Sequence, residues 1–304
     1  MQHASTDAGE PATVDPTAAS FLETLDALED LERGTARTNG LDTAYYRRGS
    51  GQPVVFVHPM GMSATVWAHQ LDAFGDDFDV VAYDTRGHGH TGGSPRESYT
   101  IELYALDLRA LLAALDVSQP VLVGASMGGA IAQQYAATYP DDVAGLVLVD
   151  PISTVPVGWR GRAAMGFVTL LSRLDRVVPY DALNRLQVRA YEALSPGSAG
   201  NADAILELMA ADPAIDHEEL VKVADATTGF PRSDFDPTAV TAPTLVCYGD
   251  AIPGTLAKMA TGLETHLSNA DVDVVTVPDA GHGSVVDDPA VVTDSIRAFL
   301  DTVA

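Results

Sequence analysis

The sequence predicts an α/β protein built on a doubly wound, mostly parallel sheet with an inserted helical cap. Short apolar strand candidates alternate with helical patterns through most of the chain, as such a sheet requires. One of them, at 121–123, passes through a glycine-rich turn directly into the helix-like stretch 130–135. Between about 152 and 240 the alternation stops, and apolar residues recur at helical spacing. A chain of 304 residues is long enough to bury a full core.

The amino end differs from the rest of the chain. Residues 1–18 are rich in Ala, Thr, Asp and Pro and contain no apolar block, which predicts a disordered tail without a secretory signal or a membrane span. From Ser20 the pattern becomes amphipathic, and Ser20 to Glu23 is typical of a capping box. We therefore expect residues 1–38 to be an N-terminal extension whose helix packs on the catalytic domain.

Seven strands are expected in the core. They lie near 43–48, 54–58, 78–83, 120–124, 145–149, 244–248 and 272–277. Residues 39–151 and 241–304 then make up one catalytic core, and 152–240 is a helical cap inserted after the strand that ends at Asp150. A cap over the sheet edge would cover the pocket, restrict water and select the substrate.

The segment Gly124-Ala125-Ser126-Met127-Gly128 lies where a strand turns sharply into a helix, which is the context of a nucleophile elbow. Side chains at the two flanking glycines would collide with neighbouring backbone in so tight a turn. Ser126 is therefore the candidate nucleophile. A serine hydroxyl is a weak nucleophile, so the chain must also supply a base.

His282 is the candidate base among the eight histidines. It follows the strand-like segment 272–277 and precedes the last helical pattern, so it lies on a loop at the C-terminal end of a strand, where open α/β sheets place their sites.

The oxyanion of an acyl-transfer reaction needs backbone donors. We assign them to the amides of Met60, in the turn after the strand 54–58, and Met127, directly after the nucleophile.

Together these stretches resemble the α/β-hydrolase superfamily from about Asn39 to the C-terminus. His58-Pro59-Met60-Gly61 looks like its oxyanion-loop motif with Pro59 in place of the usual glycine, and Asp84 to Gly89 is similar to its Asp-x-Arg-Gly-His-Gly turn. The resemblance is greatest to the branch of lactonases, esterases and carbon-carbon hydrolases. Ser126 excludes the aspartate nucleophile of members that open epoxides or remove halide.

The catalytic acid departs from this family pattern. The family most often carries it at the fourth residue of a Gly-x-x-Asp turn, which reads Gly249-Asp250-Ala251-Ile252 here. Asp150, at the end of the preceding strand, and Asp250, two residues early on the usual loop, are both available. We favour Asp150, because the end of a strand beside the elbow strand holds a carboxylate more rigidly than a displaced loop position does.

Charge, cysteine content and the absence of certain motifs indicate which partners, location and cofactors to expect. The formal net charge of −25 argues against nucleic acid and anionic membranes as partners, and it suggests a halophile whose salt screens the self-repulsion. The single cysteine, Cys247, cannot form an internal disulfide, which fits a reducing cytoplasm. No metal-ligand spacing or phosphate-binding motif is present, so we expect neither a metal nor a cofactor.

The expected function is acyl transfer to Ser126 from a small carboxylic ester or lactone, followed by hydrolysis. A carbon-carbon hydrolase, a thioesterase or an amidase could use the same residues. A non-catalytic protein that binds a small molecule on the same fold is the competing class, favoured by Ile252 in place of the usual acid. Substrate identity and oligomeric state are left open by the sequence.

Overall fold

A computed structural model describes residues 15–173 and 200–303, together with 182, 185–186, 188–189, 192–193 and 197–198. Most of the tail expected at 1–18 lies outside the described residues. Those of its residues that are described belong to the start of a helix, with Asp15 as its N-cap.

The described strands form one eight-stranded sheet in the order β1-β2-β4-β3-β5-β6-β7-β8. They are β1 Glu32–Thr38, β2 Leu41–Gly49, β3 Pro53–Val57, β4 Asp79–Tyr83, β5 Val121–Ala125, β6 Gly145–Val149, β7 Thr244–Gly249 and β8 Val272–Val277. The pairs β1/β2 and β2/β4 are antiparallel, and all other pairs are parallel. The predicted fold class, a mostly parallel α/β sheet, is confirmed.

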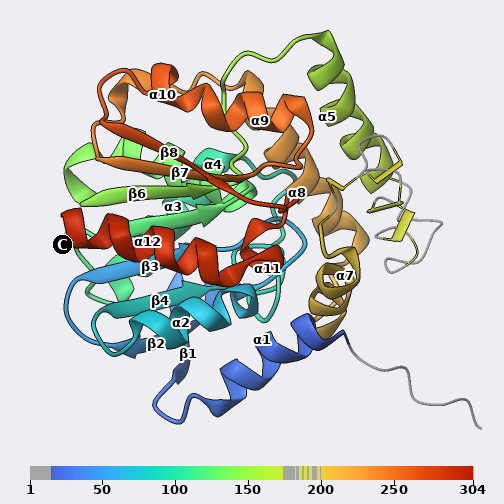
Figure 1. Ribbon diagram of the computed structural model, residues 1–304. Helices are drawn as coiled ribbons and strands as arrows, with labels where there is room; N and C mark the ends of the chain where they lie inside the picture. The colour runs from blue at the N-terminus through green and yellow to red at the C-terminus, as the bar shows by residue number, and fades with distance from the viewer. Residues whose placement is uncertain are drawn as a thin grey trace, which may run out of the picture.

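Helices cover both faces of this sheet (Figure 1). The described helices are α1 Pro16–Ala27, α2 Ala68–Phe74, α3 Ile101–Ala114, α4 Met127–Thr138, α5 Trp159–Ser172, α7 Ala202–Ala211, α8 His217–Gly229, α9 Gly254–Thr261, α10 Leu263–His266, α11 Ser284–Asp287 and α12 Pro289–Val303, with short 3-10 turns η1 Ala64–Trp67, η2 Pro140–Asp142, η3 Phe230–Arg232 and η4 Pro237–Ala239. Helices α1, α2 and α12 pack on one face, and α3, α4, α9 and α10 pack on the other.

The central strand β3 shows why the sheet is covered on both sides. Val54 and Phe56 point into one core, and Val55 and Val57 point into the other. All four side chains are fully buried. Successive strand residues point to opposite faces, so an uninterrupted apolar strand is stable only between two layers of helix.

Two expectations for the amino end need correction. The helix there begins at Pro16, with Asp15 as its N-cap, so Ser20 lies inside α1 and its hydroxyl contacts His69 Nε2 at 3.2 Å instead of capping. Residues 32–38, expected within the extension, form β1 and pair with β2 along their whole length. Phe21 of α1 is fully buried, so the helix packs on its own domain as expected.

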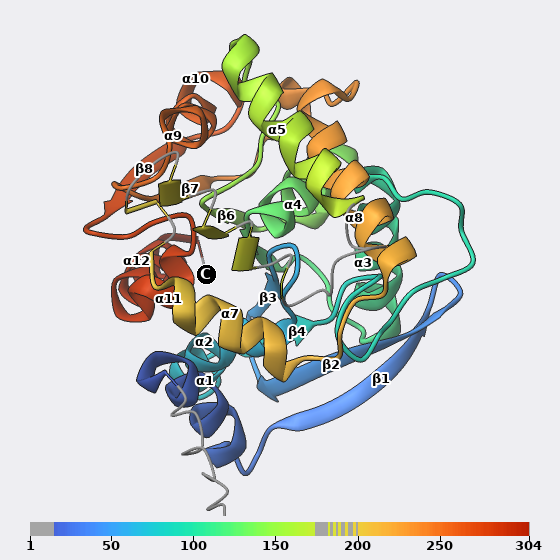
Figure 2. The ribbon, with the colours of Figure 1, turned by 90° about the vertical axis from the view of Figure 1, so that its right-hand side faces the viewer.

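Helices α5, α7 and α8 lie between β6 and β7 in the chain, where the helical insertion was expected. Figure 2 looks onto them from the side toward which the parallel strands run, with the sheet behind. Leu171 of α5 packs with Ile215 and with Leu220 of α8 in a small cluster separate from the two main cores. None of the described helices is both long and apolar enough to cross a membrane.

Candidate active site

The turn between β5 and α4 holds Ser126 in a strained backbone conformation. Its φ is 51° and its ψ is −109°, which few non-glycine residues adopt. A Cβ on Gly124 would lie 2.3 Å from the carbonyl oxygen of Gly128, and one on Gly128 would lie 2.1 Å from that of Val57. The glycines are therefore required by close backbone contact, as the elbow interpretation predicts.

The structure brings Ser126 and His282 together, although they are 156 residues apart in the chain. Ser126 Oγ lies 3.0 Å from His282 Nε2, within hydrogen-bond distance. Burial lowers the pKa of His282, and the charge of Asp150 opposes this effect. A lowered pKa keeps the imidazole neutral at pH 7, so that Nε2 can take a proton from the hydroxyl.

Asp150 is buried beside this pair, at the carboxyl end of β6. Its Oδ1 accepts a hydrogen bond from the amide of Gly249 at 3.0 Å, and its Oδ2 accepts one from the amide of Ser284 at 2.9 Å. Burial raises the pKa of Asp150, while His282 and the two amides lower it. The carboxylate is thus held between the end of β7 and the loop that carries His282.

Asp250 has a different environment. Its backbone amide donates to the carbonyl oxygen of Val277 at 3.1 Å, and its side chain is exposed to solvent. A solvated carboxylate cannot orient an imidazole as a fixed, buried one can. Of the two acids considered from the sequence, the structure places Asp150 in the electrostatic environment of His282.

The turn after β3 is fastened by two buried histidines that the sequence analysis did not select. His58 Nδ1 lies 2.8 Å from the carbonyl oxygen of Pro59, and His58 Nε2 accepts from the amide of Thr85 at 2.9 Å. His88 Nε2 accepts from the amide of Gly61 at 3.2 Å. Burial lowers the pKa of His58 to about 4 and that of His88 to about 3, so both rings are neutral near pH 7.

This anchoring fixes the peptide that carries the Met60 amide. The peptide unit is planar and trans, so its N–H points opposite to the Pro59 carbonyl that His58 holds. Met127 is the first residue of α4, where backbone amides have no acceptor within the helix. The position of His58, directly before the turn, was the available signal for its role.

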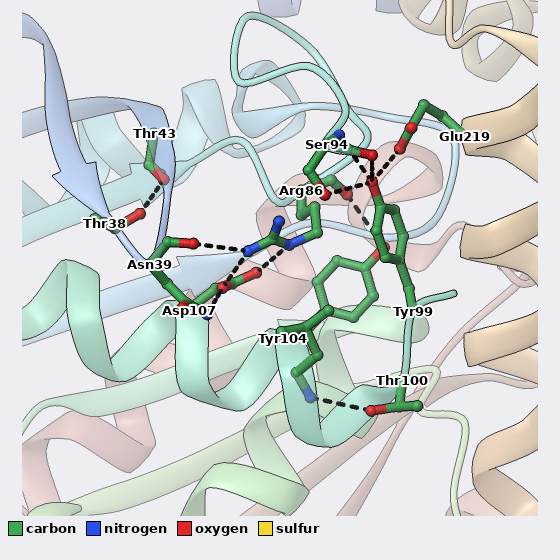
Figure 3. A network of polar contacts seen from close by, with 11 residues as sticks. Thr38, Asn39, Thr43, Arg86, Ser94, Tyr99, Thr100, Tyr104, Asp107 and Glu219 are labelled. Atoms are coloured by element: carbon green, nitrogen blue, oxygen red, sulfur yellow. Dashed lines mark hydrogen bonds and ion pairs between the residues drawn. The ribbon is translucent and has the colours of Figure 1, made fainter. Parts of the chain in front are cut away.

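The segment that carries His88 is itself held by a buried network, drawn in Figure 3. Arg86 donates two hydrogen bonds of 2.7 Å to the carboxylate of Asp107 on α3, and Tyr104 donates to the Arg86 carbonyl oxygen at 3.1 Å. Tyr99 donates to the carboxylate of Glu219 on α8. The loop after β4 is therefore tied both to the core and to the inserted helices.

The loop that carries His282 also contacts the insertion. The amide of His282 donates to the carbonyl oxygen of Ser198 at 3.0 Å. Asp287 accepts from the amide of Gly281 at 2.7 Å and from that of Asn201, the N-cap of α7, at 2.6 Å. Asp287 is a third residue that sequence reasoning missed, because its two partners lie on separate segments. Among the described residues, no group of three or more histidines, cysteines and carboxylates is arranged to hold a metal ion.

Comparison with known families and sequences identifies proteins that are similar to this chain over most of its length. A family model described as alpha/beta hydrolase fold matches residues 52–289. The 3-oxoadipate enol-lactonase 2 of Acinetobacter baylyi is 25% identical over 270 residues, which cover 88% of this chain and 95% of that protein. The 2-(acetamidomethylene)succinate hydrolase of Mesorhizobium japonicum is 27% identical over 266 residues, with 84% and 90% covered.

Other similarities are shorter or structural. An uncharacterized protein of Mycobacterium tuberculosis is 35% identical over 111 residues, but the match spans 36% of this chain and about a third, 32%, of that protein. A solved esterase from Thermogutta terrifontis superposes with a TM-score of 0.71 at 27% identity, covering 90% of this chain and 98% of the esterase.

Proposed function

This chain belongs to the α/β-hydrolase family and is an enzyme of that family, and from this premise we propose that it hydrolyses small carboxylic esters or lactones through an acyl-enzyme on Ser126. The observation that carries the proposal is the 3.0 Å contact between Ser126 Oγ and His282 Nε2 at the end of the parallel strands. The similar lactonase and esterase support the substrate class.

In the proposed first half-reaction, His282 Nε2 takes the hydroxyl proton as Ser126 Oγ bonds to the acyl carbon. The amides of Met60 and Met127 stabilise the oxyanion, with His58 and His88 as positioning residues for the Met60 turn. The intermediate collapses, the bond to the leaving alkoxide oxygen breaks, and that oxygen receives the proton from His282. With a lactone, the alcohol stays attached to the acyl group.

In the second half-reaction, water replaces the alcohol. His282 takes a proton from the water as its oxygen attacks the acyl carbon, and the ester bond to Ser126 then breaks. The proton returns to Ser126 Oγ and the carboxylic acid leaves. Asp150 is the proposed acid that orients His282 and stabilises its protonated form, a role supported by its burial and its two backbone hydrogen bonds.

We further propose that α5, α7 and α8 act as a cap that selects the substrate, and that the enzyme works in a salt-rich cytoplasm. The cap assignment is supported by the contacts of Ser198 and Asn201 with the His282 loop and its partner Asp287. The location is supported by the net charge of −25 and by the single, buried Cys247.

Covalent labelling tests the core of this proposal. The purified chain, kept in high salt, is treated with a fluorophosphonate, and peptide mass analysis locates the adduct. We expect the adduct on Ser126, none in Ser126→Ala, and unchanged labelling in Ser153→Ala, whose hydroxyl is buried and donates to the carbonyl oxygen of Met259. A panel of p-nitrophenyl esters and lactones then defines the substrate, with a loss of about 10⁵-fold or more in Ser126→Ala. A folded chain without an adduct at Ser126 would refute the acyl-enzyme.

A further inference from the structure

The loop that carries His282 is held by a carboxylate at each end. After His282, Asp150 accepts a hydrogen bond from the amide of Ser284 at 2.9 Å. Before it, Asp287 Oδ2 accepts one from the amide of Gly281 at 2.7 Å. The imidazole keeps its place only while this short loop does, because a side chain moves with its own backbone. Asp150 has a proposed role beside the imidazole, whereas Asp287 has none.

The second oxygen of Asp287 reaches the inserted helices. Its Oδ1 accepts a hydrogen bond from the amide of Asn201, the N-cap of α7, at 2.6 Å. The side-chain oxygen of Asn201 accepts from the amide of Ala204 at 3.2 Å, and its side-chain nitrogen donates to the hydroxyl of Thr17 on α1 at 3.0 Å. Figure 2 shows α7 beginning beside α11 and lying along α1. One carboxylate therefore joins the loop of the candidate base to α7 and, through Asn201, to α1.

The segments that meet at Asp287 are in close contact. A Cβ on Gly200, two residues before α7, would overlap the carboxylate of Asp287. A Cβ on Gly281 would lie 2.5 Å from the nitrogen of Gly200 and 2.5 Å from the carbonyl oxygen of Ser198. The same carbonyl oxygen accepts the amide of His282 at 3.0 Å. A displacement of the start of α7 would therefore either break these contacts or move the loop.

We propose that Asp287 is a positioning residue for His282, and that it makes the position of the base depend on contact with the start of α7. The described hydrogen bonds of its carboxylate go to backbone amides, so it acts through the loop and not on the substrate. Such bonds are charge-assisted and hold their partners strongly. The inference rests on the proposed function, since it takes His282 as the base. The inserted helices then complete the site in addition to covering it.

Substitutions at Asp287 test the positioning role. Asp287→Ala removes both acceptors and should lower kcat by about 10²-fold, because a displacement of about 1 Å in a catalytic group can cost that much. KM should change little, since Asp287 makes no contact with the substrate in this proposal. Asp287→Asn keeps one acceptor oxygen, so its loss should be intermediate, about tenfold.

The neighbouring carboxylate provides a matched control. Asp288 accepts a hydrogen bond from the amide of Val291 at 3.0 Å, at the start of α12. Asp288→Ala should lower Tm, because a helix loses a side-chain acceptor at its first turn, and should leave kcat unchanged. Equal losses of Tm and of kcat in Asp287→Ala and Asp288→Ala would show that Asp287 acts only through stability, which would overturn the proposal.

A double-variant cycle tests the dependence on α7. Asn201→Ala removes the side chain that caps α7 and contacts α1, so the amide that Asp287 accepts is held less firmly. This substitution should lower kcat by itself and have no further effect in the Asp287→Ala background. Additive losses would show that the two residues act separately, and the dependence on α7 would be wrong.

Hydrogen exchange reports the position of the loop without relying on activity. The peptide that contains Gly281 and His282 should take up deuterium faster in Asp287→Ala than in the parent and in Asp288→Ala, with all three shown to be folded by circular dichroism. Unchanged exchange would overturn the proposal. Faster exchange with an unchanged kcat would also overturn it, because the loop would then move without an effect on the base.

The same experiments separate this inference from the proposed function. If the fluorophosphonate labels Ser126 in the parent and Asp287→Ala keeps its full kcat, the positioning role is wrong and the acyl-enzyme stands. If the folded parent has no adduct at Ser126, the acyl-enzyme is refuted and with it the role of Asp287 in the reaction. Labelling of the parent, together with a lower kcat, an unchanged KM and faster exchange in Asp287→Ala, supports both.

Discussion

At the scale of single residues, Asp150 shows how a carboxylate is kept in one orientation. Each of its oxygens accepts a backbone amide, one from Gly249 and one from Ser284, so rotation of the carboxyl group would break both bonds. Its backbone φ of 44° is itself uncommon for a residue with a side chain. Such strain is tolerated where the surrounding contacts determine the backbone conformation, and strained residues are frequent at functional sites.

Replacement of the two candidate acids tests this assignment. Asp150→Asn should lower kcat by about 10³- to 10⁴-fold, because the orienting charge is lost, whereas Asp250→Asn should be mild. The charge of Asp150 raises the pKa of His282, so its removal should also move the acidic limb of the residual pH–rate profile to lower pH. Steady-state kinetics from pH 4 to 9 provides both quantities. The reverse ranking would transfer the role to Asp250.

His58 provides a second test at the residue scale. Without its contact to the Pro59 carbonyl oxygen, the peptide before Met60 can rotate and misdirect its amide. His58→Ala should therefore lower kcat by about 10²-fold with little change in KM, because the oxyanion forms only during the reaction. His69→Ala, at a half-buried histidine that contacts α1, is the control. Equal effects in the two variants would show that His58 acts only through stability.

At the scale of elements, the end of α7 is joined to the turn after β3 by one carboxylate. Asp212, which follows α7, accepts a hydrogen bond at 2.7 Å from the hydroxyl of Ser63, the N-cap of η1. Burial raises the pKa of Asp212 to about 6. Because the folded state holds this proton more tightly than the unfolded state, the contribution of Asp212 is most favourable below about pH 4 and is lost as the pH rises through 6.

Asp212→Asn should remove this pH dependence. The variant keeps an oxygen for Ser63 and has no charge to bury, so its Tm should exceed that of the parent at pH 7–8, and the two should converge near pH 4. Thermal unfolding between pH 4 and 8 measures the difference, with Asp234→Asn, at an exposed carboxylate, as the control. Parallel curves for parent and variant over this range would contradict the assignment.

The elements differ in how well the sequence predicts them. Strands β3 to β7 are largely apolar, since both of their faces are buried, whereas the edge strand β8 reads VDVVTV and is partly exposed. The expected bounds of β3 to β8 are within one residue of the structure. Strand β1 has the sequence ERGTART and was missed, because an edge strand is held mainly by its backbone pairing with β2 and needs no apolar pattern. The start of α1 was misplaced because Ser20 to Glu23 fits the capping-box pattern, whereas the residue that caps the helix is Asp15, directly before Pro16.

At the scale of the whole molecule, charge is the dominant feature. A net charge of −25 on 304 residues destabilises the compact state through self-repulsion, most strongly where few ions are present to screen it. Many of the ion pairs among the described residues are exposed and contribute little each, so they do not offset this repulsion. The balance should therefore depend on the ionic strength.

We expect activity and Tm to rise with salt into the molar range. The Debye length falls from about 10 Å at 0.1 M to about 3 Å at 1 M, which removes most repulsion between surface carboxylates. Thermal unfolding and ester hydrolysis in 0.1–3 M KCl measure the effect, and sucrose at matched osmolality controls for general exclusion from the surface. Full stability and activity in dilute buffer would refute the proposed adaptation to salt.

The sequence by itself determined the sheet class, the elbow around Ser126 and the loop of His282. Each of these is a local pattern, since apolar runs, turn glycines and the order of strand and helix are read within a few neighbouring residues. Local patterns carry the chemistry of this enzyme but do not say which distant side chains meet.

Only the tertiary structure decided which distant residues lie in contact. Asp150 is 99 residues from Gly249 and 134 from Ser284, and it reaches both because parallel strands end at the same edge of the sheet. The same applies to His58 and His88, which fasten the Met60 turn from two different strand ends, and to Asp287, which links the His282 loop to α7. Their roles depend on proximity in space, which residue type and spacing do not encode.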